Sequence, residues 1–249
     1  MLRIATWNLD RPRVSQSARR ARLSQSVMAV AADIWILTET HATITPGQNF
    51  AVATTSAPER PHEQGEAWVA VWSRFPLAPL RATGDPVRAV AVRVSPPGAR
   101  ALIVYGSVLP WLGSPWRDVP ATRGAAFGAA LEVQLRDWIA LQTENSDCDF
   151  VLAGDLNQDL AETHFYGSRA NRAALSAAFT QAQLVCLTRG NADPVRRQTH
   201  GQRASVDHVC VSERLAHRET SPPVVWPDEQ SPKANLSDHF GVVVQLGGA

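Results

Sequence analysis

The sequence predicts an α/β fold in which mixed β-sheets carry helices on their outer faces, within one layered domain. Three observations lead to this prediction. Strand–helix–strand units alternate with strand pairs that have no helix between them. No repeat, low-complexity segment or linker divides the 249 residues. Hydrophobic residues make up 45% of the chain and charged residues 19%, a composition typical of a globular domain that buries a sizeable core.

Short apolar or alternating runs predict the strands. In chain order they lie at residues 2–7, 34–37, 67–72, 89–94, 101–108, 150–153, 206–211 and 240–246. The runs at 67–72 and 89–94 are expected to pair with each other, because a turn-bearing connection at residues 73–77 lies between them.

Apolar residues at helical spacing predict the helices. The first helix is expected to include the arginine-rich stretch 11–22, to continue through Leu23 and Val27, and to end near Asp33. The second has one apolar face, made by Phe127, Leu131, Leu135 and Trp138, and a shorter third helix carries Leu175 and Phe179. Residues 112–122 and 189–203 are expected to be loops.

The charge balance and the cysteines exclude several classes of protein. The formal net charge of +1 argues against coating nucleic acid through bulk positive charge, although it permits a local basic patch. Cys148, Cys186 and Cys210 are few, far apart and odd in number, which indicates neither a zinc site nor a disulfide framework. No signal peptide or run of ~20 apolar residues is recognisable, so we expect a cytoplasmic monomer without stable membrane insertion.

Acidic, amide and histidine side chains gather at the ends of five predicted strands. They are Asn8 with Asp10, Glu39, Asp155 with Asn157, Asp207, and Asp238 with His239. Strand ends meet at one edge of a layered α/β fold, so these distant segments are expected to converge on one site. Each segment taken alone also fits an ordinary turn or polar loop. The five together favour a functional site.

The residue types suit hydrolysis of a phosphate ester with a hard divalent cation. Carboxylate and amide oxygens favour Mg²⁺ or Mn²⁺ over zinc. Asp155 is able to accept a proton from water, and Asn157 is able to donate an amide hydrogen bond. His239 is able to donate to a phosphoryl oxygen if a carboxylate fixes its ring, and Asp207 is the candidate for that carboxylate.

Five segments also carry a resemblance to a known family. They are Thr-Trp-Asn-Leu-Asp at 6–10, Asp-Ile-Trp-Ile-Leu-Thr-Glu-Thr at 33–40, Ala-Gly-Asp-Leu-Asn at 153–157, Val-Asp-His at 206–208 and Leu-Ser-Asp-His-Phe at 236–240. They resemble the signature segments of the endonuclease/exonuclease/phosphatase superfamily. That superfamily includes abasic-site endonucleases, pancreatic-type deoxyribonucleases, neutral sphingomyelinases and inositol-polyphosphate 5-phosphatases. The segments span nearly the whole chain, so one domain is expected over residues 1–249.

The resemblance implies a four-layer sandwich of two mixed sheets flanked by helices, and magnesium-dependent phosphate ester hydrolysis. Asn8, Asp10, Glu39 and Asp238 match the family's metal-binding positions. Asp155 matches the residue that positions or activates water, and Asn157 matches a phosphate-contacting amide. His239 matches the phosphate-binding histidine that pairs with the residue matched by Asp207.

Two positions depart from the family pattern. Related enzymes often carry His or Tyr just after the strand that ends here near Val108, and Ser107 occupies that place. A serine is a poor proton donor to a leaving group, so that role has no assigned residue. Abasic-site enzymes usually carry a bulky aromatic residue shortly before the aspartate matching Asp207, whereas this chain reads Arg-Ala-Ser-Val at 203–206. A pocket for an abasic sugar is therefore not expected.

A nuclease that hydrolyses a phosphodiester of DNA or RNA is the favoured function. Arg11, Arg13 and Arg197 are candidate contacts for flanking phosphates, with Ser107 and Trp111 as further candidate substrate contacts. Solvated surface or core packing explains these residues equally well. Two alternatives stay open: a phosphatase or phosphodiesterase for a small phosphorylated metabolite or lipid headgroup, and a non-catalytic binding module.

Overall fold

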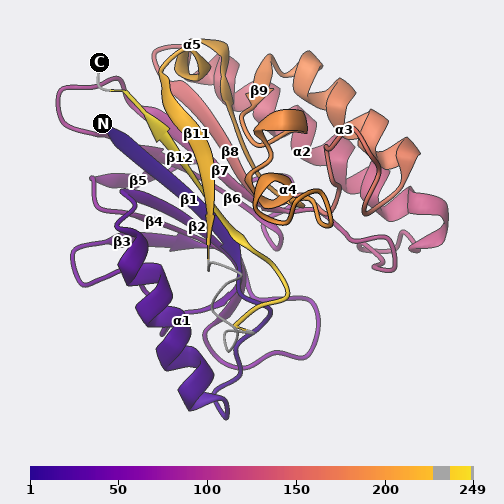
Figure 1. The fold of residues 1–249 in the computed structure, drawn as a ribbon, viewed down its shortest axis with the longest axis horizontal. Helices are drawn as coiled ribbons and strands as arrows, with labels where there is room; N and C mark the ends of the chain where they lie inside the picture. Colours follow the sequence, from indigo (N-terminus) through magenta and orange to yellow (C-terminus); the bar gives the residue numbers. More distant parts are fainter. Residues whose placement is uncertain (227–235, 248–249) are drawn as a thin grey trace.

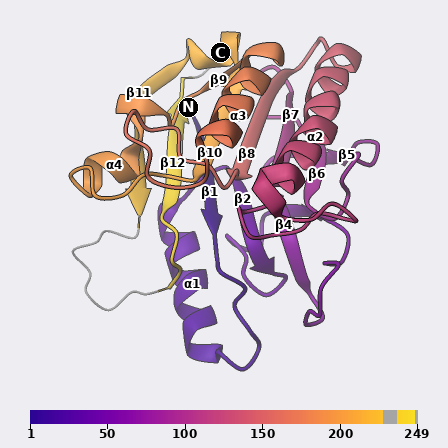
Figure 2. The same cartoon turned by 90° about the vertical axis from the view of Figure 1, so that its right-hand side faces the viewer.

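The computed structural model describes residues 1–226 and 236–247, which form two six-stranded β-sheets packed face to face. Helix α1 (Ser17–Val30) covers the outer face of one sheet (Figure 1). Helices α2 (Ala125–Glu144) and α3 (Arg169–Gln181) cover the outer face of the other (Figure 2). The prediction of a four-layer α/β sandwich of two mixed sheets is therefore confirmed.

The first sheet has the strand order β11-β12-β1-β2-β4-β3. Its strands are β1 (Leu2–Asn8), β2 (Ile34–His41), β3 (Ala51–Thr54), β4 (Glu66–Ser73), β11 (Glu219–Trp226) and β12 (Gly241–Leu246). β1 and β2 are parallel, with Asn8 opposite Thr38, and β12 runs antiparallel on the other side of β1. The first and last strands are therefore neighbours in the middle of this sheet.

The second sheet has the strand order β5-β6-β7-β8-β10-β9. Its strands are β5 (Leu77–Pro79), β6 (Ala89–Val94), β7 (Leu102–Val108), β8 (Asp149–Asp155), β9 (Leu184–Cys186) and β10 (Asp207–Ser212). β7 and β8 are parallel, with Val108 opposite Asp155, and β10 is antiparallel to β8, with Asp207 opposite Asp155. Two acidic residues thus stand side by side at one edge of the sheet.

The expected pairing of residues 67–72 with 89–94 is wrong. β4 pairs with β2 and β3 in the first sheet, whereas β6 pairs with β5 and β7 in the second. The two strands instead contribute to the hydrophobic core between the sheets, where Val69 and Val71 share a cluster with Val92 and Val94. Apolar residues in both strands made them look like a pair, but the connection between them crosses from one sheet to the other.

Two further expectations need correction. The first helix begins at Ser17 and not at Arg11, because Asp10 and Arg11 adopt positive φ values of 48° and 44°, which are not helical. The segment 189–203 is not all loop: it contains the 3₁₀ turn η2 (Gly190–Ala192) and the short helix α4 (Pro194–Gln198). The Asp193 carboxylate caps α4 by accepting from the amides of Val195 and Arg196 at 2.9 and 3.1 Å.

The sequence pattern did not reveal the remaining elements. They are the four edge strands β3, β5, β9 and β11, the 3₁₀ turn η1 (Thr122–Gly124) and helix α5 (Glu213–Ala216). β11 contains Pro222 and Pro223 and pairs through two register shifts, as expected of an edge strand. No helix in residues 1–226 or 236–247 is long and apolar enough to cross a membrane.

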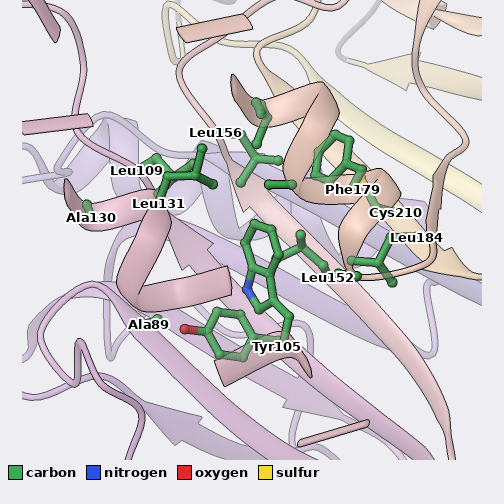
Figure 3. Packing of buried hydrophobic residues seen from close by; sticks show 14 of the residues in the cluster. Ala89, Tyr105, Leu109, Ala130, Leu131, Leu152, Leu156, Phe179, Leu184 and Cys210 are labelled. Atoms are coloured by element: carbon green, nitrogen blue, oxygen red, sulfur yellow. The ribbon is translucent and has the colours of Figure 1, made fainter. Parts of the chain in front are cut away.

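An aromatic core fixes α2 and α3 on the second sheet. Trp138 of α2 stacks on Phe179 of α3 with ring centroids 6.2 Å apart, and it meets Tyr105 of β7 edge to face at the same separation. Figure 3 shows Tyr105 and Phe179 among the aliphatic residues of this cluster. The helices are therefore held rigidly behind the strands that carry the acidic residues.

Candidate active site

The polar strand ends named in the sequence analysis converge where the two sheets meet at one end of the sandwich. Asn8 ends β1 and Glu39 lies near the end of β2, both in the first sheet. Asp155 ends β8 and Asp207 begins β10, both in the second. The site is therefore assembled from both layers of the sandwich.

Asn8 joins the two sheets through its side-chain amide. Its Nδ2 donates to Oδ2 of Asp155 at 2.9 Å and lies 3.3 Å from Oε1 of Glu39. Its Oδ1 accepts from the backbone amide of Asp10 at 2.9 Å. Asn8 is 1% exposed, so these contacts are made away from bulk water. The amide holds two carboxylates close together that would otherwise repel each other.

Asp155 and Asn157 form a compact turn at the end of β8. The backbone amide of Asn157 donates to Oδ1 of Asp155 at 3.0 Å, and its Nδ2 donates to Oδ2 of Asp155 and to the carbonyl of Leu109. The residue before this turn is Gly154, at φ +140°, and a Cβ there would lie 2.0 Å from the carbonyl oxygen of Ser107. Only glycine lets β8 approach β7 this closely just before Asp155.

His239 and Asp207 form the second half of the cluster. Nδ1 of His239 lies 2.6 Å from Oδ2 of Asp207. The ligand atoms of Asp155, Asp207 and His239 all lie within 4.8 Å of one another. The other oxygen of Asp207, Oδ1, is buried and has no hydrogen-bond partner among the described residues. The cluster therefore contains a carboxylate oxygen that is able to accept a hydrogen bond or bind a cation and that no described residue uses.

The loop that carries His239 is fastened to β1. The hydroxyl of Ser237 donates to the carbonyl of Asn8 at 2.7 Å and accepts from the amide of His239. The indole Nε1 of Trp7 donates to the carbonyl of His239 at 3.0 Å. Because these bonds connect residues more than 200 positions apart, the histidine depends on the first strand for its position.

The electrostatics of the cluster are those of closely spaced buried carboxylates. Burial, together with the charges of Asp207 and Glu39, raises the pKa of Asp155 to about 7, although the charge of His239 opposes this rise. Burial lowers the pKa of His239, but attraction to Asp207 and Asp155 outweighs it and brings that pKa to about 10. At neutral pH the imidazole ring is therefore protonated, with a donor hydrogen on each nitrogen.

The four predicted metal-binding residues occupy different environments. Asn8 and Glu39 are buried in the cluster. The Asp10 side chain is 47% exposed and pairs with Arg19 at 3.1 Å, and the Asp238 side chain is 76% exposed. Oε2 of Glu39 pairs with Nε of Arg11 at 2.6 Å. A cation already lies against this carboxylate, in the form of a guanidinium group.

The donor set fits a hard divalent cation. The buried carboxylates of Glu39 and Asp155 are held by the amide of Asn8. The buried Asp207 lies beside them, and its Oδ1 has no partner among the described residues. Burial is the largest cause of the raised pKa of Asp155, and the charges of Asp207 and Glu39 add to it. Oxygen ligands of this kind bind Mg²⁺ or Mn²⁺, and no thiolate lies among them.

The five candidate substrate contacts lie in four different settings. Arg11 and Arg13 line a polar pocket of about 590 Å³ that also includes Asp10 and Arg60. The Ser107 hydroxyl is fully buried and donates to Oε1 of Gln134 at 2.6 Å. Trp111 is half-buried, and its ring centre lies 6.4 Å from that of Trp68. Arg197 donates to the carbonyls of Ala192 and Pro223, which ties α4 to β11.

A second pocket, of about 220 Å³, opens beside His239. Its polar wall includes Asn157, Tyr166, Arg203, Asp207, Asp238 and His239, and its apolar wall includes Phe165, Val195 and Phe240. The guanidinium of Arg203 donates to the carbonyl of Asp238 at 2.6 Å and lies 4.8 Å from the ring centre of Phe240. Phe240 ends the signature segment 236–240 without having been assigned a role, and Tyr166 belongs to no periodic or motif-like segment.

Comparisons with known proteins agree with this geometry. The profile described as "Endonuclease/Exonuclease/phosphatase family" matches residues 5–239. No curated protein matches the chain. Among solved structures, AP endonuclease LMAP from Leishmania major is 14% identical, with a TM-score of 0.71 over 100% of this chain and 88% of that one.

Two further solved structures are similar over nearly their whole length. The endonuclease domain of TRAS1, a telomere-specific non-LTR retrotransposon, is 15% identical, with a TM-score of 0.69 over 99% of this chain and 98% of that one. The 3'-5' exonuclease NExo from Neisseria meningitidis is 18% identical, with a TM-score of 0.63 over 99% of this chain and 100% of that one. At these identities the likeness shows a shared fold.

Proposed function

The chain belongs to the Endonuclease/Exonuclease/phosphatase family, a family of phosphoester hydrolases, and on that premise we propose that it is a metal-dependent nuclease. It hydrolyses a phosphodiester by in-line attack of water. The observation that carries the proposal is the contact of Asn8 with Asp155 and Glu39, beside the buried pair of Asp207 and His239. One cluster thus contains oxygen ligands for a metal ion, a carboxylate that is able to accept a proton, and a positively charged imidazole that is able to bind phosphate.

We propose that Asn8, Asp10, Glu39 and Asp238 hold Mg²⁺ or Mn²⁺. When bound, the ion would polarise a phosphoryl oxygen and offset the charge that develops in the transition state. Arg11 is placed to leave Glu39 and bind a phosphate of the substrate, because its guanidinium is 41% exposed on its side-chain surface while it contacts the carboxylate.

Asp155 is the proposed acceptor of the proton from the attacking water. Both of its oxygens are fixed by amide donors, from Asn8 and from Asn157, so the carboxylate has one orientation. A base that is held in one orientation and has a pKa near the working pH is efficient at proton transfer. The side-chain amide of Asn157 supports this residue and is the proposed contact to the phosphate.

His239 is the proposed donor to a phosphoryl oxygen. Asp207 holds Nδ1 at 2.6 Å, so the ring presents Nε2 away from that carboxylate. The high pKa of His239 keeps the ring cationic at neutral pH, and a cationic donor stabilises negative charge on the phosphate.

Nucleic acid is the proposed substrate. Three of the solved structures with this fold are described as an AP endonuclease, the endonuclease domain of a retrotransposon and a 3'-5' exonuclease. Arg11 and Arg13 beside the cluster offer contacts for flanking phosphates, which suits a polymer. The family domain is proposed to span residues 1–249, and the monomeric state and cytoplasmic location remain predictions from the sequence.

One substrate panel tests the proposal. Purified protein is assayed with Mg²⁺, with Mn²⁺ and with EDTA against plasmid DNA, an abasic oligonucleotide, bis-p-nitrophenyl phosphate, an inositol phosphate and sphingomyelin. We expect cleavage of DNA that EDTA abolishes. Hydrolysis of the inositol phosphate or sphingomyelin without cleavage of DNA would overturn the choice of substrate. No hydrolysis of any substrate with either metal would overturn the enzymatic function.

A further inference from the structure

The backbone of the loop between β8 and α3, which passes over the candidate active site, is held in place by buried side chains. Asp159, which is fully buried, accepts the backbone amides of Ala161, Phe165 and Tyr166 at 3.2, 2.9 and 2.7 Å. Its carboxylate also pairs with Arg172 at 3.0 Å. A single side chain thus binds three amides of the loop, which fixes the backbone on both sides of its turn.

The C-terminal end of this loop is held as tightly. The side chain of Gln158 accepts the amide of Ser168 at 3.0 Å. Gly167 lies between them at φ +86°, and a Cβ there would meet Oε1 of Gln158 at 2.2 Å. The chain needs glycine at this point so that the loop can close against Gln158, which places the preceding residue, Tyr166, over the site.

Tyr166 faces the same pocket as the catalytic candidates. It lines the 220 Å³ pocket together with Asn157, Asp207, Asp238 and His239. The residue is 38% exposed, and its hydroxyl makes no hydrogen bond within residues 1–226 and 236–247. Burial and the charges of Asp155 and Asp238 raise the pKa of the phenol. The hydroxyl therefore remains a hydrogen-bond donor throughout the neutral pH range.

The hydroxyl groups of the neighbouring strand β7 do not reach this pocket. Ser107 is fully buried and donates to Gln134, and Tyr105 donates to Asp137 at 3.1 Å in the core behind the sheet. Tyr105 and Tyr166 are the two tyrosines of the chain, so Tyr166 is the tyrosine available to a ligand at the site. Tyr166 lies in the loop after β8, whereas related enzymes often carry a His or Tyr just after the strand that matches β7.

We propose that Tyr166 is a substrate-contacting residue: its hydroxyl donates to a non-bridging oxygen of the phosphate ester bound by His239, and its ring forms a wall for the group attached to that phosphate. This inference rests on the proposed function of the same site. Phe165 and Phe240 make the rest of that wall apolar, so the attached group presents a ring face to them, as a nucleoside does.

Kinetics of three variants test the proposal. Tyr166→Phe, which keeps the ring, is expected to lower kcat/KM for DNA by about 10- to 100-fold, the range for a hydrogen bond to a charged group. Tyr166→Ala is expected to raise KM as well, because the wall is lost. Tyr105→Phe removes the other tyrosine hydroxyl far from the pocket and is the matched control, expected to stay within twofold of wild type. The thermal midpoint of each variant is measured alongside.

Binding without turnover separates this inference from the proposed function. The probe is a thymidine dinucleotide with a phosphorothioate diester, titrated in Mg²⁺ by calorimetry. We expect Tyr166→Phe to bind it at least 10-fold more weakly than wild type. Binding by wild type together with failure to hydrolyse any diester would overturn the nuclease proposal alone. Equal binding by both proteins would overturn the role of Tyr166 alone, and no binding by wild type would overturn both proposals.

Discussion

The side-chain amide of Asn8 and the carboxylate of Asp155 are 2.9 Å apart although they belong to different sheets. This bond connects the end of β1 to the end of β8 across the sandwich. Neither sheet contains a complete set of candidate groups by itself. The chemistry of the site therefore depends on how the two sheets are packed, and variants at their shared edge are the most informative tests.

Glu39 is the first target. Glu39→Gln is expected to abolish metal-dependent hydrolysis, because it removes a negative charge from the proposed Mg²⁺ site and leaves Arg11 without its ionic partner. The thermal midpoint should change little, since glutamine has the same size and removes one of several closely spaced buried negative charges. Activity is measured with and without EDTA, and Glu132→Gln on the exposed face of α2 is the control. Activity in Glu39→Gln that resists EDTA would remove Glu39 from the metal site.

Asp155 links activity to stability. Asp155→Asn is expected to lose at least ~100-fold in turnover, as for loss of a general base. In EDTA it should become progressively more stable than wild type as pH rises. The folded-state pKa of Asp155 is raised to about 7, so its contribution to stability is present below its ordinary pKa and is lost as pH rises through 7. Thermal midpoints at pH 4 and pH 8 measure this. A difference that is the same at both pH values would contradict it.

His239 and Asp207 are expected to act as one unit. His239→Ala should lose at least ~100-fold in turnover because a cationic donor to the phosphate is removed. Asp207→Asn should weaken the same contact by releasing Nδ1. The double variant should lose little beyond the larger single loss, since each change disables the same group. Turnover numbers for the four proteins complete the cycle, and additive losses would show that the two residues act separately.

Arg13 tests whether the substrate is a polymer. Cleavage of DNA by wild type is expected to fall steeply between low and moderate salt, because binding releases counterions from the phosphates. Arg13→Gln should reduce the slope of log affinity against log salt by about 1, the value for one phosphate contact. Arg136→Gln, on the outer helix α2, is the control and should leave the slope unchanged. A flat salt response in wild type would favour a small substrate.

The sequence predicted the elements with strong patterns and the residues at their ends. Asn8, Glu39, Asp155, Asp207 and His239 all follow or precede buried strands, and they do converge. The pairing partners of the strands were harder to predict from the sequence, because β4 and β6 are both apolar and either strand would fit in either sheet. The short edge strands were missed because they bury few side chains and show no alternation.

The pocket residues that come from loops could not be predicted from the sequence, for a different reason. Tyr166 reaches the pocket only because Asp159 binds three amides of its loop, and no pattern in residues 159–168 reveals that arrangement. The same holds for Arg203, whose contact with the Asp238 carbonyl joins segments 35 positions apart. Side chains that depend on loop geometry cannot be located from periodicity, which reports only on regular elements.

The antiparallel pairing of β1 with β12 has a consequence for the order of folding. The loop carrying His239 is fastened to Trp7 and Asn8, which lie more than 200 positions away along the chain. A partly folded chain in which β1 and β12 have not yet met would hold Asp155 and Asp207 on the second sheet without the histidine between the sheets. Completion of the candidate site would therefore report that the first sheet has closed.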